Sequence, residues 1–387
     1  MTYSNSRNQK IDFLRGIAII AVLILHFNLS YHIGESALNK IFSVDFIKTI
    51  ASNGNYGVTM FFVISGFLIT STSLERYGSL GKIDIIGFYI FRFSRIMPCL
   101  VLVLTLIVAF SFAQITIFKN DPNTTTLFLA VLSVLTFWHN FLMEKIGYFN
   151  YCLNIFWSLS VEEIFYIAFP LLCLSFKKTK LIIPFLATLI IISPIYRSFH
   201  TDNEIVALYG YLSCFDAIAI GCCSAFIARK IQLVGLLESS IRYSAWLLII
   251  TVYLYSGVME NVVIGVSLIA LGTAILLITT SQKKLASGNS NKTLDSVVCW
   301  FGKNSYELYL FHIIVLALMK EIIRPESLGD HTKLLWMATF IALSAMVSGA
   351  IAKYYSQPLN KKLREFFFSL RQRNIQPTDA AIESNYL

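Results

Sequence analysis

Charge is scarce in this chain. Only 14% of its 387 residues are Asp, Glu, Lys or Arg, whereas about a quarter of the residues of a soluble domain are usually charged. Hydrophobic residues make up 56%, and the mean hydropathy is +0.67. This composition excludes an ordinary soluble globular protein. Long apolar runs recur between residues 11 and 355, so the sequence predicts an all-α, polytopic bundle of transmembrane helices.

Cysteine clusters of the kind that bind metals are also missing. The seven cysteines follow no metal-ligand spacing, and most lie inside apolar runs, so we interpret them as small packing residues and expect no metal site. A cleavable signal peptide is not apparent either. The first apolar run is followed by His26 and Asn28 rather than by small residues, and we therefore expect this span to be retained.

Basic residues exceed acidic ones by nine charges, but their positions argue against nucleic-acid binding. They gather in short segments between apolar runs, which is the positive-inside pattern of membrane proteins. The segments contain Arg7 and Lys10; Arg76, Lys82, Arg92 and Arg95; Lys177, Lys178 and Lys180; Arg229, Lys230 and Arg242; Lys283, Lys284 and Lys292; and Lys361, Lys362, Arg364, Arg371 and Arg373. The pattern predicts that both termini are cytoplasmic.

Eleven apolar runs are candidates for membrane spans. They are residues 11–29, 56–74, 98–118, 127–142, 156–176, 181–195, 206–227, 243–255, 262–280, 297–319 and 334–354. The basic segments require an even number of crossings between them, and one of the three runs between Arg95 and Lys177 breaks this rule. We expect 127–142 to be re-entrant or interfacial, which leaves about ten spans. Residues 1–365 then form one transmembrane domain, and 366–387 a basic, then polar, disordered tail.

The first apolar run carries polar residues that are costly in a bilayer. Arg15 and His26 are eleven residues apart, which at about 100° per residue places them within roughly 20° of each other around a helix. They lie roughly 16 Å apart along its axis. Two interpretations are open: the side chains extend to the two membrane surfaces, or they form a polar stripe that faces a cavity, with His26 as its reactive group.

Two further stretches combine small or basic residues with apolar ones. Gly57, Ser65 and Gly66 have the spacing of small residues that let helices approach closely, and packing is the favoured interpretation. Arg92 and Arg95 lie one helical turn apart on one face. They either anchor the helix at the cytoplasmic surface or bind the phosphates of a nucleotide-containing donor.

Carboxylates and a second histidine occur inside later runs. Glu162 and Glu163 are adjacent, so they point about 100° apart and are not expected to form a carboxylate dyad. They either belong to an ion pair or face a cavity, and Asp216 lies in or near another span. Tyr306, Tyr309 and His312 follow one another at three-residue spacing. A polar residue satisfied between helices is the first interpretation of His312, and catalysis is the alternative.

Taken in order, these stretches resemble the membrane-bound acyltransferase-3 family. The matching segments are DFLRGIAIIAVLILHF, GVTMFFVISGFLI, FRFSRIMP, WSLSVEEIFY, FDAIAIG and SYELYLFH, and the resemblance runs from about Asn8 to Arg364. Two positions depart from the family's usual pattern: Gln357 replaces a common Glu before proline, and Glu307 replaces a common small residue. No periplasmic hydrolase-like domain follows the resemblance, so we expect the membrane-only form of the family.

The resemblance implies an enzyme that transfers an acyl group, usually acetyl, from acyl-CoA to a hydroxyl group. Bacterial surface polysaccharides and lipid-linked precursors, such as an O-antigen unit, are its usual acceptors, and the location would be the bacterial inner membrane. The sequence leaves open the identity of the acceptor, the choice between acetyl and succinyl donors, and the oligomeric state.

These implications suggest roles for ten residues. His26 is the preferred general base because imidazole titrates nearest neutral pH; Glu162 or Glu163, with a preference for Glu162, would orient it. We assign Arg15, Arg92 and Arg95 to the coenzyme phosphates, and Trp157, Ser158, Tyr306 and His312 to substrate binding. An extended pantetheine arm could then run between Arg15 and His26. The alternatives are a transporter or flippase with His26, Glu162 and Asp216 as a proton relay, and a non-catalytic partner in envelope assembly.

Overall fold

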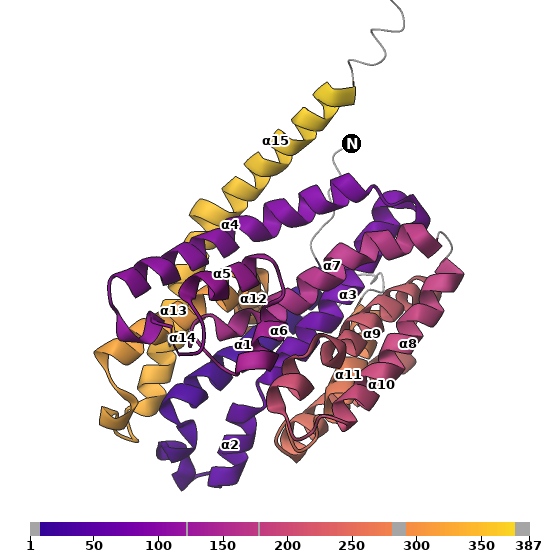
Figure 1. Cartoon of the computed structure of the whole chain (residues 1–387). Coiled ribbons are helices and arrows are strands. Elements are labelled where there is room, and N and C mark those ends of the chain that lie inside the picture. Colours follow the sequence, from indigo (N-terminus) through magenta and orange to yellow (C-terminus); the bar gives the residue numbers. More distant parts are fainter. Residues whose placement is uncertain (1–7, 121–122, 177–178, 281–291, 376–387) are drawn as a thin grey trace, which may run out of the picture.

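The computed structural model describes residues 8–120, 123–176, 179–280 and 292–375 (Figure 1). These residues form fifteen α-helices and no strand, which confirms the predicted all-α fold. The helices are α1 (Gln9–Tyr31), α2 (Val44–Ser52), α3 (Asn55–Tyr77), α4 (Ile85–Phe112), α5 (Leu127–Leu135), α6 (His139–Ile146), α7 (Trp157–Phe176), α8 (Thr179–Ser198), α9 (Tyr211–Lys230), α10 (Gly235–Tyr255), α11 (Gly265–Thr280), α12 (Lys292–Lys303), α13 (Ser305–Ile322), α14 (Lys333–Ile351) and α15 (Gln357–Ile375).

Seven helical stretches in the described part of the chain are long and apolar enough to cross a membrane. They are Gln9–Tyr31, Val44–Tyr77, Ile85–Phe112, Asn154–Phe176, Leu181–Ser198, Ile205–Lys230 and Lys333–Gln372. Helices α10, α11 and α13 occupy three more of the predicted spans. Helix α11 has only 16 residues, and α13 carries three charged residues among its 18. The chain is therefore a multi-pass membrane protein.

The run 127–142 does not form one continuous helix. It is divided into α5, with nine residues, and α6, with eight, at Phe137, whose φ of 61° interrupts the helical backbone. A membrane-spanning helix needs about 20 residues, so neither piece can cross alone. The structure therefore supports the prediction that this run does not cross as a full span.

Two predicted boundaries were wrong. The run 297–319 is divided between α12 and α13 at Asn304, whose side-chain amide donates to the carbonyl of Trp300 and so ends α12. The expected disordered tail does not begin at residue 366, because α15 continues as a helix to Ile375. A π-helical turn, Ala352–Ser356, joins it to α14. Residues 376–387 lie outside the described residues.

Glycines bring α1 and α3 into close contact with their neighbours. A Cβ atom on Gly57 of α3 would lie 2.4 Å from the carbonyl oxygen of Ala18 in α1. A Cβ on Gly66 would lie 2.0 Å from the carbonyl oxygen of Ile218 in α9. On α1 itself, Gly16 packs in the same way against Val298 of α12. The packing interpretation of Gly57 and Gly66 is thus confirmed.

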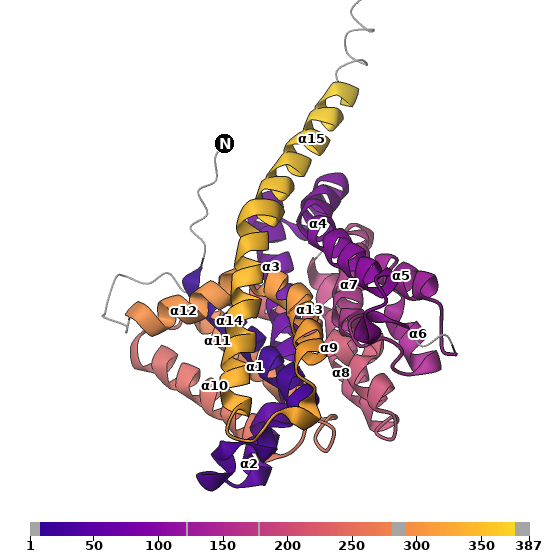
Figure 2. The same ribbon diagram turned by 90° about the vertical axis from the view of Figure 1, so that its left-hand side faces the viewer.

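The helix ends that carry basic residues gather at one end of the bundle. Figures 1 and 2 show α15 leaving the molecule at the end opposite α2. The starts of α1, α4, α13 and α15 and the ends of α3, α9 and α12 line one cavity there. This agrees with the grouping that the charge pattern predicts.

Candidate functional site

A cavity of about 1000 Å³ opens among these helix ends. Seven arginine or lysine residues and three carboxylates line it, which leaves a surplus of four positive charges. The cations are Arg15, Arg76, Arg92, Arg95, Arg229, Lys303 and Arg364, and the acids are Asp12, Glu75 and Glu307. We call this space the basic cavity. Its charge suits a ligand with several negative charges, because guanidinium groups bind phosphate oxygens through paired hydrogen bonds.

Two arginines of the basic cavity share one aromatic ring. The guanidinium carbon of Arg76 lies 3.9 Å from the ring centroid of Phe91, and that of Arg364 lies 5.0 Å from it. Arg76 ends α3 and Arg364 belongs to α15, so Phe91 of α4 connects three helices. Stacking on a ring holds an arginine in place without neutralising its charge, which leaves both cations available to an anion.

A second, narrow cavity of about 100 Å³ lies deeper in the bundle. Arg15, Arg92, Arg95 and Tyr306 line both spaces, so the two cavities adjoin at these side chains. Arg92 lies with its guanidinium carbon 4.1 Å from the ring centroid of Tyr166. Arg15, Arg92 and Arg95 therefore lie between the basic cavity and the narrow cavity.

Glu162 faces the narrow cavity and is held by two hydroxyl groups. Ser65 donates a hydrogen bond of 2.9 Å to its carboxylate, and Tyr166 donates one of 3.3 Å. Ser65 thus contributes a hydrogen bond in addition to its small size. Glu163 is buried but does not line the narrow cavity, and its Oε1 has no hydrogen-bond partner among the described residues. The geometry therefore favours Glu162 as the glutamate that can meet a ligand.

Hydroxyl groups from α7 and α13 close the narrow cavity on another side. Ser158 donates a hydrogen bond of 2.6 Å to the hydroxyl of Tyr309, which in turn donates to the carbonyl of Ile155. Tyr306, one turn earlier on α13, donates to the carbonyl of Ile96. These contacts place α4, α7 and α13 around one polar space.

His26 and His312 lie side by side beyond Tyr309. Their ring centroids are 4.9 Å apart, and the centroid of Tyr309 is 5.8 Å from that of His312. The Nδ1 atom of His312 lies 3.0 Å from the carbonyl oxygen of Leu308. A carbonyl can only accept, so this contact assigns the proton to Nδ1 and leaves Nε2 as an acceptor. That Nε2 is buried with no partner among the described residues, which suits it to receive a proton from its neighbourhood.

Comparison with known proteins identifies the family. The family described as "Acyltransferase domain" matches residues 8–355. The chain belongs to this acyltransferase-3 family. It is 25% identical over 407 aligned residues to the peptidoglycan O-acetyltransferase OatA of Listeria monocytogenes, an alignment that covers 96% of this chain and 59% of the relative. It is 24% identical over 390 aligned residues to the O-acetyltransferase OatA of Staphylococcus aureus, with coverages of 95% and 59%. The chain thus spans about three fifths of the length of these curated relatives. No solved structure gives a significant match.

Within this acyltransferase domain, most of the predicted site residues meet. Helices α1 and α13 pack together and bring Arg15 beside Tyr306 and His26 beside His312, and Arg92 and Arg95 line both cavities, as their spacing indicates. The glutamates do not take the predicted position beside the base. Glu162 binds Ser65 and Tyr166, and the ring next to His26 is that of His312.

The two departures from the family pattern lie close together. Glu307 accepts a hydrogen bond of 2.6 Å from Ser356, the residue before Gln357. All three line the basic cavity of the acyltransferase domain. A carboxylate is therefore still present at this site, although it comes from α13 instead of from the start of α15.

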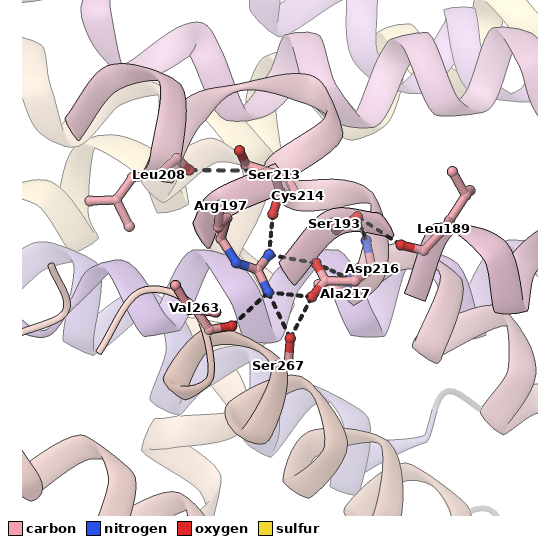
Figure 3. Close-up of polar contacts among 10 residues, drawn as sticks. All are labelled: Leu189, Ser193, Arg197, Leu208, Ser213, Cys214, Asp216, Ala217, Val263 and Ser267. Atoms are coloured by element: carbon pink, nitrogen blue, oxygen red, sulfur yellow. Dashed lines mark hydrogen bonds and ion pairs between the residues drawn. The ribbon is translucent and has the colours of Figure 1, made fainter. Parts of the chain in front are cut away.

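Asp216 forms a buried ion pair with Arg197 (Figure 3). The transporter alternative would need this aspartate as a proton carrier. The guanidinium of Arg197 binds both of its carboxylate oxygens, at 3.0 and 2.7 Å, and Ser267 donates a third hydrogen bond. The side chains of Arg197 and Asp216 are 1% and 0% exposed. We call this group the Arg197 node. It joins α8, α9 and α11, and its saturated carboxylate gives no support to a proton relay.

Sequence reasoning missed several residues of the site. Arg76 and Phe91 come from the consecutive helices α3 and α4, whereas Arg364 comes from α15, so the sequence does not show that the three side chains meet. Tyr309 lay in a recognised periodic run, and only its hydrogen bond with Ser158 distinguishes it from its neighbours. The signal that could have found Arg364 is its conspicuous position in the basic segment that follows the last apolar run.

Proposed function

We propose that this chain is a membrane O-acetyltransferase that moves an acetyl group from acetyl-CoA to a hydroxyl group of a cell-surface saccharide. One observation carries the proposal: a strongly cationic cavity adjoins a narrow cavity, and the histidine pair lies beyond Tyr309, which lines that narrow cavity. Family membership and the names of the relatives support the reaction class.

In this proposal the coenzyme lies in the basic cavity. Its phosphates would bind Arg92, Arg95 and Arg15, and its pantetheine arm would extend into the narrow cavity toward Tyr309. The length of α1 between Arg15 and His26 is about 16 Å, a distance that an extended arm can cover. The basic cavity would face the cytoplasm, in accordance with the positive-inside distribution of charge, and both termini would be cytoplasmic in a bacterial inner membrane.

The chemistry follows from the two histidines. His26 accepts the proton of the acceptor hydroxyl as its oxygen attacks the thioester carbonyl carbon. The resulting tetrahedral oxyanion needs hydrogen-bond donors. Ser158 and Tyr309 contribute hydroxyl groups to the narrow cavity, which would serve once they turn from their present acceptors, Tyr309 and the carbonyl of Ile155. The carbon–sulfur bond then breaks, His26 returns the proton to the departing thiolate, and the products are an acetyl ester and free coenzyme A. His312 positions His26 through the contact between their rings.

The test removes the base. In a deletion strain complemented with His26→Ala, we expect transfer to fall by about 10²- to 10⁴-fold, the contribution of a general base, with protein abundance unchanged. Mass spectrometry of the surface polysaccharide would show the added acyl mass with the wild type alone. That mass would also identify the donor class and distinguish acetyl from succinyl.

His32→Asn is the matched control. His32 is an exposed histidine six residues further along, in a left-handed conformation that asparagine tolerates, and this variant should retain full transfer. Retained activity in His26→Ala would overturn the role of His26. Uptake of a saccharide into vesicles without consumption of acetyl-CoA would favour the transporter instead.

A further inference from the structure

A group of aromatic and acidic side chains lies on the surface near the start of α7. Tyr148 precedes α7 and is 50% exposed; its hydroxyl donates a hydrogen bond of 3.2 Å to the hydroxyl of Tyr209. Tyr209 donates in turn to the carboxylate of Glu204, at 3.3 Å, and Glu204 is exposed. We call Tyr148, Tyr209 and Glu204 the tyrosine platform. It combines two aromatic rings and a carboxylate in one hydrogen-bonded chain.

An unusual turn of the backbone builds this platform. Residues Ile205–Tyr209 form a π-helical turn rather than an α-helical one. Side chains hold both ends of the turn: Asn140 donates to the carbonyl of Tyr209, and Ser213 donates to the carbonyl of Val206. Turns of this kind are rare and occur frequently at functional sites. Here the turn places the ring of Tyr209 against that of Trp157, with centroids 4.5 Å apart and the ring planes tilted by 38°.

The platform connects to the site of the proposed reaction through Trp157. This residue is buried and begins α7, and the next residue, Ser158, lines the narrow cavity. Phe62, whose ring is 5.9 Å from that of Trp157, lines the same cavity. From the surface inward, the order is therefore Tyr148, Tyr209, Trp157 and then the cavity wall.

The platform and the basic cavity lie at opposite ends of α9. That helix begins at Tyr211, two residues after Tyr209, and ends at Lys230, beside cavity residue Arg229. Its 20 residues correspond to about 30 Å, the thickness of the hydrocarbon core of a bilayer. A molecule on the platform would approach the inner cavity from the side opposite the coenzyme.

The chemistry of the platform fits a sugar. The C–H face of a pyranose ring is apolar and stacks against the negative face of an aromatic ring. The hydroxyl groups at the edge of the sugar need acceptors, and an ionised carboxylate is the strongest acceptor that a protein offers. Membrane-facing tyrosines, by contrast, need no carboxylate in their hydrogen-bonded chain.

We propose that the tyrosine platform is the acceptor site, and that it binds a pyranose unit of a surface saccharide by stacking on Tyr148 and Tyr209 and by hydrogen bonding to Glu204. Trp157 forms the inner wall of this site and directs the next part of the saccharide toward Ser158 and the histidine pair. This inference rests on the proposed function, because it assigns the place of the saccharide in that reaction.

The experiment measures the two substrates separately. The full chain, in lipid nanodiscs, receives acetyl-CoA and the envelope carbohydrate of the producing strain after its acetyl esters have been removed with alkali. The release of coenzyme A thiol gives KM values for donor and carbohydrate. Tyr148→Ala and Glu204→Gln change exposed side chains and should fold. We expect each to raise the carbohydrate KM by about three- to tenfold, the effect of one lost aromatic or charged contact, with the donor KM unchanged.

Tyr148→Phe and Tyr255→Ala are the controls. Phenylalanine retains the ring and should recover most of the loss in Tyr148→Ala. Tyr255, at the end of α10, is 79% exposed and lies outside the platform, so its replacement should change neither KM. An unchanged carbohydrate KM in both platform variants would overturn the acceptor site while the proposed reaction stands. A wild type that transfers nothing to the carbohydrate would overturn both.

Discussion

Arginine meets carboxylate in two buried regions of this protein, and the two regions are built differently. In the Arg197 node, one guanidinium binds one carboxylate through both oxygens, and its two terminal nitrogens also donate to Ser267 and to the carbonyls of Ser213 and Val263. In the narrow cavity, three arginines line the same space as Glu162, and the carboxylate of Glu162 accepts hydrogen bonds from Ser65 and Tyr166. One region has matched charges, whereas the other has more arginines than carboxylates and lines a cavity.

This difference distinguishes arginines that stabilise the fold from arginines that can bind a ligand. A buried ion pair whose partners bind each other through two hydrogen bonds has its charges neutralised within the chain, and it costs several kcal/mol when only one partner is removed. A cavity lined by more cations than acids has a positive potential, which attracts an anionic ligand. A sequence shows only that arginines and carboxylates occur near apolar runs. The three-dimensional arrangement decides which of them can bind.

The largest expected effect comes from breaking the Arg197 node on one side. Asp216→Leu leaves the guanidinium of Arg197 buried without its partner, at a cost of about 3–5 kcal/mol, so we expect most of the folded protein to be lost. The measurement is the amount of monodisperse protein after detergent extraction, together with its Tm. The double variant Arg197→Met with Asp216→Leu removes both charges and should recover folding. If Asp216→Leu folded normally and lost only activity, the comparison between the two regions would fail.

Replacing an arginine of the cavity should act on binding and not on folding. Arg92→Gln removes a charged donor worth about 1.5–3 kcal/mol, which corresponds to an increase of roughly 10- to 100-fold in the KM for acetyl-CoA. Steady-state kinetics at varied donor concentration would measure it, with the Tm as a check on folding. Arg242→Gln is the control, since Arg242 pairs with Glu238 on α10 and lies outside both cavities. A fall in Tm for Arg92→Gln at an unchanged KM would place Arg92 with the structural arginines.

A third arginine–carboxylate contact, between Arg371 and Asp84, lies on the surface and should have the smallest effect. It joins α15 to the residue that precedes α4, and the hydrogen bond from Arg371 lowers the pKa of Asp84 below its usual 3.8. Because the folded pKa is the lower one, this stabilisation is complete above pH 3.8 and disappears as the pH falls through the folded value.

Hydrogen exchange of α15 in the wild type and in Asp84→Asn tests this contact. We expect slightly slower exchange in the wild type at neutral pH, because the ion pair holds α15 against α4. The difference should vanish at a pH well below 3.8, where Asp84 is protonated in both the folded and the unfolded chain. A difference that persists there would show that the carboxylate acts through something other than its charge.

Much of the fold could be predicted because each helix shows its own pattern. Low charge, long apolar runs and basic segments indicated a polytopic bundle. They also indicated that the run 127–142 does not cross the membrane as a full span. The break at Asn304 was missed because the apolar residues on its two sides were joined into one run across Gly302–Ser305. Asn304, which bonds back to Trp300, ends α12. The length of α15 was missed because a polar, basic segment resembles a disordered tail, whereas packing against α4 stabilises it.

The candidate site likewise contains contacts that the sequence predicted and contacts that it did not. Residues on one helix were paired correctly from periodicity, as Arg92 with Arg95 and Tyr306 with Tyr309. Pairs across helices were not: nothing in the sequence joins His26 to His312, or Glu162 to Ser65, because these contacts depend on how the helices pack. For the same reason Arg197 did not stand out, although Asp216 did.

The glycine contacts around α1 have a mechanical consequence. Gly16 meets the backbone of α12, while Gly54 and Gly57 meet the carbonyl oxygens of Ala21 and Ala18, so α1 is clamped from two sides along the stretch between Arg15 and His26. A helix held by backbone contacts on two sides cannot slide or rotate without collisions. Helix α1 is therefore held in place by α3 and α12, and we expect any movement that admits a ligand to involve the helices that line the cavities with it: α4, α7 and α15.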